Sequence, residues 1–470
     1  MAMSCGLGPK LSRLLSNSDA RHAVHVCCFI LWLVCFELFS GGIRPFTDAD
    51  DFNPWLRYGW FCCGLLYVMR LLSLLVLPQT LANMLGLCLF NAFRQKVRLK
   101  GSPLLASFVS VRVVTRGDYP DLVKANVRRN METCLKAGME NFIFEVVTDR
   151  PINFEKHQRI REIVVPPTYQ TKTGALFKAR ALQYALEDEV NVLSDDDWIV
   201  HLDEDIMTEE SVCGVLNFVM DGRHQFGQGV ITYASGDIVN WVTTLADSFR
   251  VADDLGKLRF QFYYFHKPLF GWKGSFVVSQ VGAERKVTFD HGRDGSIAED
   301  CHVSMVAYRD GYTFNFIEGE MQEKSPFSFW DFLQQRKRWL QGIYLVVHSQ
   351  QVPLKYKFFL ALSLYAWAFL PFTSLNLVVV SVWPLPRHFV FDFCVAFVGA
   401  VPIYMYVFGA IRSFGNKYRH KPWRLVLYTL GAVFTLPFNL WIENVAVIWG
   451  IVGYKHQFYV VNKDWRVLDV

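Results

Sequence analysis

Two carboxylates follow an apolar segment near the middle of the chain. Trp198–Leu202 is typical of a buried strand, and Asp203, Glu204 and Asp205 come directly after it. On an extended chain, residues two apart point to the same face, so we expect Asp203 and Asp205 to converge while Glu204 points away. Such a pair suits a hard cation, Mn²⁺ or Mg²⁺, that bridges a diphosphate and neutralises its charge. The acids at 195–197 precede the strand, and we interpret them as a solvated turn.

Two further groups of side chains could act on a bound substrate. Glu299 and Asp300 precede a helical stretch, and a carboxylate there could accept the proton of an attacking hydroxyl. The alternative is an acid that complements the dipole at the start of a helix. Gln335, Arg338 and Trp339 lie in an amphipathic stretch. A guanidinium suits a diphosphate and an indole suits a sugar face, but a basic and aromatic anchor at a membrane surface is an equal alternative.

Alternating strand and helix patterns position these side chains. We expect strands at 108–115, 142–148, 162–166, 198–202 and 230–233, and helices at 122–137, 177–187 and 211–220. Strands that alternate with helices predict a parallel sheet covered on both faces, with the site at the carboxyl ends of the strands.

The composition points to a membrane protein. Hydrophobic residues make up 52% of the 470 residues and charged residues only 19%, which is unusual for a soluble domain. Five apolar runs are long enough to cross a bilayer: 23–39, 59–77, 356–383, 389–411 and 425–450. Residues 79–93 are expected to form an interfacial helix. Two alternatives stay open: 23–39 as a cleaved signal peptide, and 425–450 as a re-entrant hairpin.

The charges beside these runs orient the chain. The N-terminal segment carries Lys10, Arg13 and Arg21 against a single acid, and the loop at 412–424 carries five basic residues and no acid. By the positive-inside rule both lie in the cytosol, together with the block at 94–355. No long basic tract is present, so a nucleic acid is not expected as a partner.

Two charged residues interrupt the apolar runs. Arg70 and Glu443 are costly in hydrocarbon, so we expect them to pair with each other or to reach the interface. The alternative is a polar wall along the path of a lipid acceptor. The eleven cysteines show no disulfide framework and no zinc spacing, which fits a catalytic part that faces a reducing compartment.

The order of these motifs resembles glycosyltransferase family 2, whose members have a GT-A (Rossmann-like) fold, over residues 102–345. The resemblance implies that Asp203 and Asp205 hold a metal and that Asp300 is the catalytic base. It implies a set of donor-binding residues: Asp149, Lys178, Asp203, Asp205, Gln335, Arg338 and Trp339. It also implies a set of acceptor-binding residues: Trp272, Gly274, Ser275, Glu299 and Trp339. Arg180 departs from the Lys-Ala-Gly segment that these enzymes often have.

The run at 334–342 and the layout of the terminal apolar segments are similar to the egghead-like β-1,4-mannosyltransferases within that family. This similarity implies an inverting transfer of mannose from GDP-mannose to glucosylceramide in glycosphingolipid synthesis, at the ER or Golgi, with roles in development. Two alternatives are a processive polysaccharide synthase of the chitin or hyaluronan type and a non-catalytic membrane scaffold.

The sequence divides into five parts. We expect a cytosolic N-terminus with two membrane helices and an interfacial helix at 1–101, and an α/β GT-A catalytic domain at 102–327. An interfacial amphipathic helix at 328–355, membrane helices at 356–450 and a tail at 451–470 follow.

Overall fold

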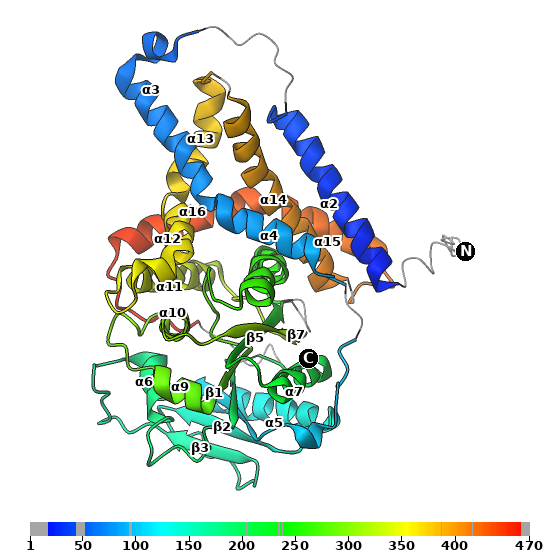
Figure 1. Cartoon of the computed structure of the whole chain (residues 1–470), viewed down its shortest axis with the longest axis vertical. Helices are drawn as coiled ribbons and strands as arrows, with labels where there is room; N and C mark the ends of the chain where they lie inside the picture. Colours follow the sequence, from blue (N-terminus) through cyan, green and yellow to red (C-terminus); the bar gives the residue numbers. More distant parts are fainter. Residues whose placement is uncertain are drawn as a thin grey trace.

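The computed structural model describes residues 17–43, 52–93, 96–203, 205–233, 236, 238–386, 388–415 and 417–461. Several residues used above lie outside this part of the chain: Lys10, Arg13, Glu204 and the last residues of the tail, 462–470. The strands gather at one end of the molecule and the apolar helices at the other (Figure 1). The predicted α/β architecture, a sheet domain between two sets of apolar helices, is confirmed.

One seven-stranded sheet forms the centre of the α/β domain, in the order β3-β2-β1-β4-β6-β5-β7. Its strands are β1 (Val109–Thr115), β2 (Phe142–Thr148), β3 (Ile160–Val164), β4 (Trp198–Leu202), β5 (Phe226–Thr232), β6 (Val277–Gln280) and β7 (Phe314–Gln322). The four strands from β3 to β4 are parallel, as predicted. All five residues of β4 are buried, which explains its continuous apolar pattern.

The prediction of an entirely parallel sheet is wrong at β6, which runs antiparallel to both β4 and β5. The first residue of β6, Val277, pairs with His201 near the end of β4. The chain therefore enters β6 from the end where β4 leaves the sheet. This places the loop at 271–276 beside Asp203 and Asp205.

Helices cover the sheet and connect its strands. They are α5 (Pro120–Lys136), α6 (Phe177–Tyr184), α7 (Glu209–Asp221), α8 (Trp241–Asp253), α9 (Val281–Val287) and α10 (Glu299–Arg309). Two short π-helical segments, η3 (Asp254–Leu258) and η4 (Gln261–Phe265), continue α8. A three-residue 3₁₀ turn, η2 (Pro103–Leu105), precedes β1.

The apolar helices lie at the other end of the molecule (Figure 1). They are α2 (Ser18–Ser40), α3 (Pro54–Leu72), η1 (Ser73–Val76), α4 (Leu77–Leu89), α12 (Leu354–Ala368), α13 (Leu370–Val382), α14 (Phe389–Phe414), α15 (Pro422–Phe434) and α16 (Leu436–Val452). By length and composition, three of the described helices could cross a membrane, or up to five spans if each bent pair is one.

The expected spans at 356–383 and 425–450 are each formed by a bent pair of helices, which can be a broken span or a re-entrant loop. The helices α12 and α13 meet at 55°, and α15 and α16 meet at 43°. In each pair the second helix has a proline in its first turn, Pro371 or Pro437. Proline lacks the N–H that would continue the preceding helix, which accounts for both breaks. The expected span at 59–77 and the expected interfacial helix merge into the run Pro54–Leu89.

The helix α11 (Phe329–His348) lies between the sheet and the apolar helices (Figure 1). The Ser328 side chain caps it by accepting the backbone N–H of Asp331. The expected pair of Arg70 with Glu443 is wrong, because each has a partner elsewhere. Arg70 forms an ion pair with Asp392, and Glu443 accepts a 3.0 Å hydrogen bond from the indole of Trp367. Pairing still removes the cost of isolated charges among apolar helices.

Candidate active site

The carboxyl end of β4 holds the two aspartates on either side of Glu204. The Asp203 side chain is 48% exposed, whereas Asp205 is fully buried. The Ser275 hydroxyl lies between them: it accepts the backbone N–H of Asp203 at 3.2 Å and donates to the carboxylate of Asp205. The two aspartates therefore share one neighbour, and their carboxylates differ in access to solvent. We expected Ser275 to bind the acceptor; in the structure its hydroxyl forms hydrogen bonds with both aspartates.

Lys178 brings four of the predicted residues together. Its ammonium lies 2.6 Å from Asp203 Oδ1, 3.5 Å from Glu299 Oε1 and 3.3 Å from the Gly274 carbonyl oxygen. Burial opposes its charge, but the carboxylates of Asp203 and Glu299 outweigh burial, so the pKa of Lys178 lies above its usual value. A permanent cation at this point suits a diphosphate.

Asp300 occupies the first turn of α10 and faces the same space. Its Oδ1 accepts the backbone N–H of Cys301 at 2.7 Å. A methyl group added at Gly274 would lie 2.9 Å from Asp300 Oδ2 and 3.4 Å from the Lys178 ammonium. Burial and then the neighbouring Glu299 raise the pKa of Asp300 to about 7. A carboxyl that titrates near neutral pH is suited to accept a proton during catalysis.

Arg338 approaches this cluster from α11. Burial lowers the pKa of its guanidinium, and the carboxylates of Glu299, Asp203 and Asp300 act in the opposite direction. Its guanidinium carbon lies 4.4 Å from the centre of the Phe458 ring. Within the part of the chain that the structure describes, the buried Arg338 Nε and Gln335 Oε1 have no hydrogen-bond partner. Polar atoms buried in this way are available to a ligand.

The remaining predicted residues lie outside this cluster or within the core. Asp149 follows β2 and is held 2.6 Å from the guanidinium of Arg180. Because β2 is two strands from β4, Asp149 is about 10 Å from Asp203 in the direction across the strands, and the register places it about two residues further along them. The Trp272 ring packs edge-on against Phe226 and Phe314 and is buried in the core.

Two guanidinium groups lie close to the ring of Trp339. The carbon atoms of the Arg250 and Arg336 guanidiniums are each 4.5 Å from its ring centre. Arg336 is held by Asp247 at 2.6 Å and by Glu443 of α16 at 3.2 Å. These contacts hold the indole in place and connect α11 to the apolar helices.

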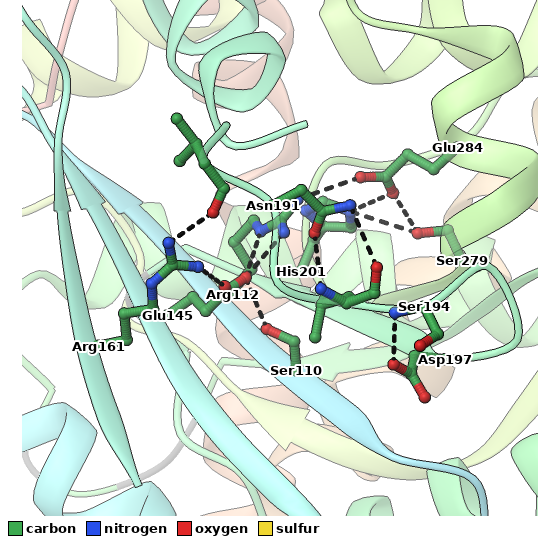
Figure 2. Close-up of polar contacts among 12 residues, drawn as sticks. Ser110, Arg112, Glu145, Arg161, Asn191, Ser194, Asp197, His201, Ser279 and Glu284 are labelled. Carbon is green, nitrogen blue, oxygen red and sulfur yellow. Dashed lines mark hydrogen bonds and ion pairs between the residues drawn. The ribbon is translucent and has the colours of Figure 1, made fainter. Parts of the chain in front are cut away.

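Sequence reasoning missed a buried charged row beneath the site. Figure 2 shows Arg112 between Glu145 and Glu284, and His201 beside Glu284. Arg112 Nη2 lies 2.7 Å from Glu145 Oε2, and His201 Nε2 lies 2.7 Å from Glu284 Oε2. Arg112 pairs in register with both Glu145 of β2 and His201 of β4.

This row holds β4 in place through His201. Because His201 is only two residues before Asp203, the row also helps to position Asp203. A signal was present in the sequence: β1 and β2 each carry one charged residue, Arg112 and Glu145, in an otherwise apolar strand. A charge in a buried strand requires a partner. The partner itself could be identified only once the register of the strands was known.

The residues present fit a hard divalent cation. Among the described residues, no group of three or more His, Cys, Asp or Glu side chains could hold a metal ion by itself. Asp203 and Asp205 offer carboxylate oxygens, which are the ligands that hard divalent cations prefer. Magnesium-type sites commonly use one or two carboxylates and complete their coordination with substrate phosphates and water. These two residues are therefore suited to an ion that arrives with a diphosphate.

Comparisons with known proteins show the family of the chain. Residues 198–411 match the family described as "Glycosyl transferase family group 2". The chain is 60% identical to "Beta-1,4-mannosyltransferase egh" of Drosophila melanogaster, over 96% of this chain and 99% of that protein. It is also 60% identical to "Beta-1,4-mannosyltransferase bre-3" of Caenorhabditis briggsae and of Caenorhabditis elegans, in each case over 95% of this chain and 99% of the relative.

Two solved structures align with the chain at low identity and low TM-score. The mannosyltransferase PcManGT from Pyrobaculum calidifontis, in complex with GDP-Man and Mn²⁺, has a TM-score of 0.47 and 13% identity over 82% of this chain and 99% of that chain. S. aureus TarS has a TM-score of 0.31 and 11% identity over 57% of this chain and 43% of that chain.

Proposed function

The chain belongs to the β-1,4-mannosyltransferases of glycosyl transferase family group 2, and we propose that it moves mannose from GDP-mannose to glucosylceramide with inversion at the anomeric carbon. That it is a mannosyltransferase follows from the family. The identity of the donor, the identity of the acceptor, the stereochemistry of the transfer and the metal are the parts that we propose. The observation that carries it is the cluster of Lys178, Asp203, Asp300 and Arg338 at the end of β4.

The proposed donor site uses the cationic side of this cluster. The diphosphate of GDP-mannose lies near the Lys178 ammonium and the Arg338 guanidinium, with Gln335 close by. Asp203 and Asp205 hold Mn²⁺ or Mg²⁺, which supplies positive charge against the diphosphate when bound. Asp149, two strands away across the sheet, contacts the nucleoside.

The proposed reaction is a single displacement. The acceptor hydroxyl gives its proton to Asp300 while its oxygen forms a bond to the anomeric carbon, and the bond from that carbon to the GDP oxygen breaks on the opposite face. GDP keeps the bonding electron pair, and Lys178 and Arg338 stabilise its added charge. Because the donor is α-linked, inversion gives the β linkage that the relatives' names describe.

The acceptor approaches from the side of α11 and the loop at 271–276. Trp339, Glu299, Gly274 and Ser275 form this side of the site in the proposal, with Trp272 supporting the loop from the core. The chain is a multi-pass endomembrane protein of the ER or Golgi, and its catalytic domain faces the cytosol, where the basic loop at 412–424 also lies.

The test is a panel of donors and acceptors with the purified full-length protein in detergent and Mn²⁺. We expect one mannose to be transferred from GDP-mannose to glucosylceramide and no product from UDP-sugars. Transfer from a UDP-sugar would contradict the donor, and growth of a polymer would support a processive synthase instead. No binding of any nucleotide sugar would support a non-catalytic scaffold.

A further inference from the structure

An apolar groove lies between α11, which carries the active-site arginine, and the apolar helix α16. Its lining includes Phe329, Trp330 and Leu333 from the first turns of α11, and Phe438, Trp441 and Val445 from one face of α16. The volume of the groove is about 140 Å³. The Phe329 and Phe438 rings meet edge-on at one side, with their centres 5.2 Å apart.

The outer rim of this groove is exposed on the surface of the molecule, beside the apolar helices. Trp330 is 56% exposed and Trp441 is 61% exposed. The helices α15 and α16 form a bent pair that is together long and apolar enough to cross a membrane. Large exposed indoles on such helices are typical of the boundary between the hydrocarbon and the headgroups of a bilayer. A hydrocarbon chain can therefore enter the groove from the membrane without passing through water.

The inner end of the groove changes from apolar to charged. Ile442 also lines the groove and packs with the buried Phe332 and Ala246. The next residue, Glu443, lies 3.2 Å from Arg336, and Arg336 in turn stacks on Trp339. The groove thus leads from an apolar mouth to the charged layer that holds the Trp339 indole.

The distance along α11 matches an amphiphilic ligand. Leu333, which lines the groove, and Trp339 are six residues apart on one helix, which corresponds to about 9 Å along its axis and about 120° around it, with Arg336 midway between them. A molecule with its hydrocarbon beside Leu333 can present its polar head at Trp339. A wholly polar acceptor would gain nothing from such a groove.

We propose that this groove binds a hydrocarbon chain of the lipid-linked acceptor and thereby places the acceptor's sugar beside Trp339. The inference rests on the proposed function, because it assumes a glycolipid acceptor. It adds a binding site for the lipid part, made by α11 and α16, to the site for the sugar at the end of β4. The groove then selects acceptors by their hydrocarbon rather than by their sugar alone.

The test compares two acceptors that carry the same glucose. Glucosylceramide has full-length chains, and a short-chain alkyl glucoside has no hydrocarbon long enough to occupy the groove. Val445→Trp fills the groove, and Ile448→Trp is the matched control, because Ile448 lies on the same helix, is 54% exposed and does not line the groove. All variants are assayed as full-length protein in detergent.

We expect Val445→Trp to raise the KM for glucosylceramide at least about tenfold, equivalent to about 1.4 kcal/mol of binding. The KM for the short-chain glucoside, the KM for GDP-mannose and kcat should stay unchanged, and Ile448→Trp should behave as wild type. An unchanged KM for glucosylceramide, or an equal rise for both acceptors, would overturn the groove as a chain-binding site. If the wild type transfers mannose to neither glucoside, the proposed acceptor fails and the inference falls with it.

A second measurement needs no variant. A glucosylceramide with a diazirine on its acyl chain is photolysed with the wild-type protein, and the labelled peptides are identified by mass spectrometry. We expect labelling of α11 and α16 near Leu333 and Val445 that excess glucosylceramide suppresses. Labelling of other helices only, or labelling that excess glucosylceramide leaves intact, would contradict the proposal.

Discussion

Neutralising Glu299 should shift the pH dependence of catalysis in a direction that the site's charges determine. Asp300 must be deprotonated to accept a proton, and burial together with Glu299 raises its pKa to about 7. The kcat/KM of the wild type for the donor should therefore rise as the pH passes about 7. Glu299→Gln removes the negative neighbour, so Asp300 ionises more readily and this acid limb should move to lower pH.

The size of the shift follows from the neighbouring charges. Two like charges about 6 Å apart at an effective dielectric constant of about 20 repel by about 2.8 kcal/mol, or about two pH units. Lys178, 3.5 Å from Glu299, offsets part of that repulsion, so we expect a shift of about one unit. Burial is the larger cause of the raised pKa and persists in the variant. The midpoint of the acid limb should therefore stay well above the usual pKa of an aspartate.

The assay measures kcat/KM for GDP-mannose between pH 5 and 9 at saturating acceptor, because this ratio reports groups of the donor-free enzyme. Glu189→Gln is the control, since it removes an exposed carboxylate from the loop after α6. A limb that moves upward or not at all in Glu299→Gln would refute the electrostatic reasoning. A limb that persists with the same midpoint in active Asp300→Asn enzyme would show that another group is titrating.

Four further outcomes are expected. Asp300→Asn should lower kcat by about 10²–10⁴-fold with an unchanged circular dichroism spectrum; near wild-type turnover would exclude it as the base. Gly274→Ala should lower kcat about tenfold by crowding Asp300, whereas Gly64→Ala, which meets no atom within 4 Å, should not change it. Arg112→Met should destabilise the fold by about 3–5 kcal/mol, because it leaves the buried Glu145 and Glu284 without their partner; a Tm as high as that of the control Arg223→Met, an exposed arginine, would contradict this. Chelation with EDTA should abolish transfer and added Mn²⁺ should restore it; full activity after exhaustive chelation would exclude a metal at Asp203 and Asp205.

The strands that position the site could be predicted from the sequence because they are short, apolar and bounded by turns. The ranges at 142–148 and 198–202 agree with β2 and β4 residue by residue. The turn at 195–197 is also as expected, with Asp195 and Asp196 exposed. The direction of β6 could not be predicted, because strand direction depends on which end of the sheet the chain enters and not on the residues of the strand.

The polar partners within the fold were harder to predict than the elements. Lys178 and Asp203 are 25 positions apart along the chain and meet at 2.6 Å, and only the sheet topology brings them together. The cost of placing a charge among apolar helices correctly predicted that Arg70 and Glu443 would each have a partner. The identity of those partners, Asp392 and Arg336, depends on how the helices rotate against one another. The rotation of the helices could not be predicted from one sequence.

The most direct test of the proposed reaction is the anomeric configuration of the product. Purified full-length protein is incubated with GDP-mannose, glucosylceramide and Mn²⁺, and the mannolipid is analysed by NMR through the coupling between its anomeric carbon and proton. We expect a single β-linked mannose, formed by the wild type and not by Asp300→Asn. An α-linked mannose would mean retention of configuration and would contradict a single displacement with Asp300 as the base.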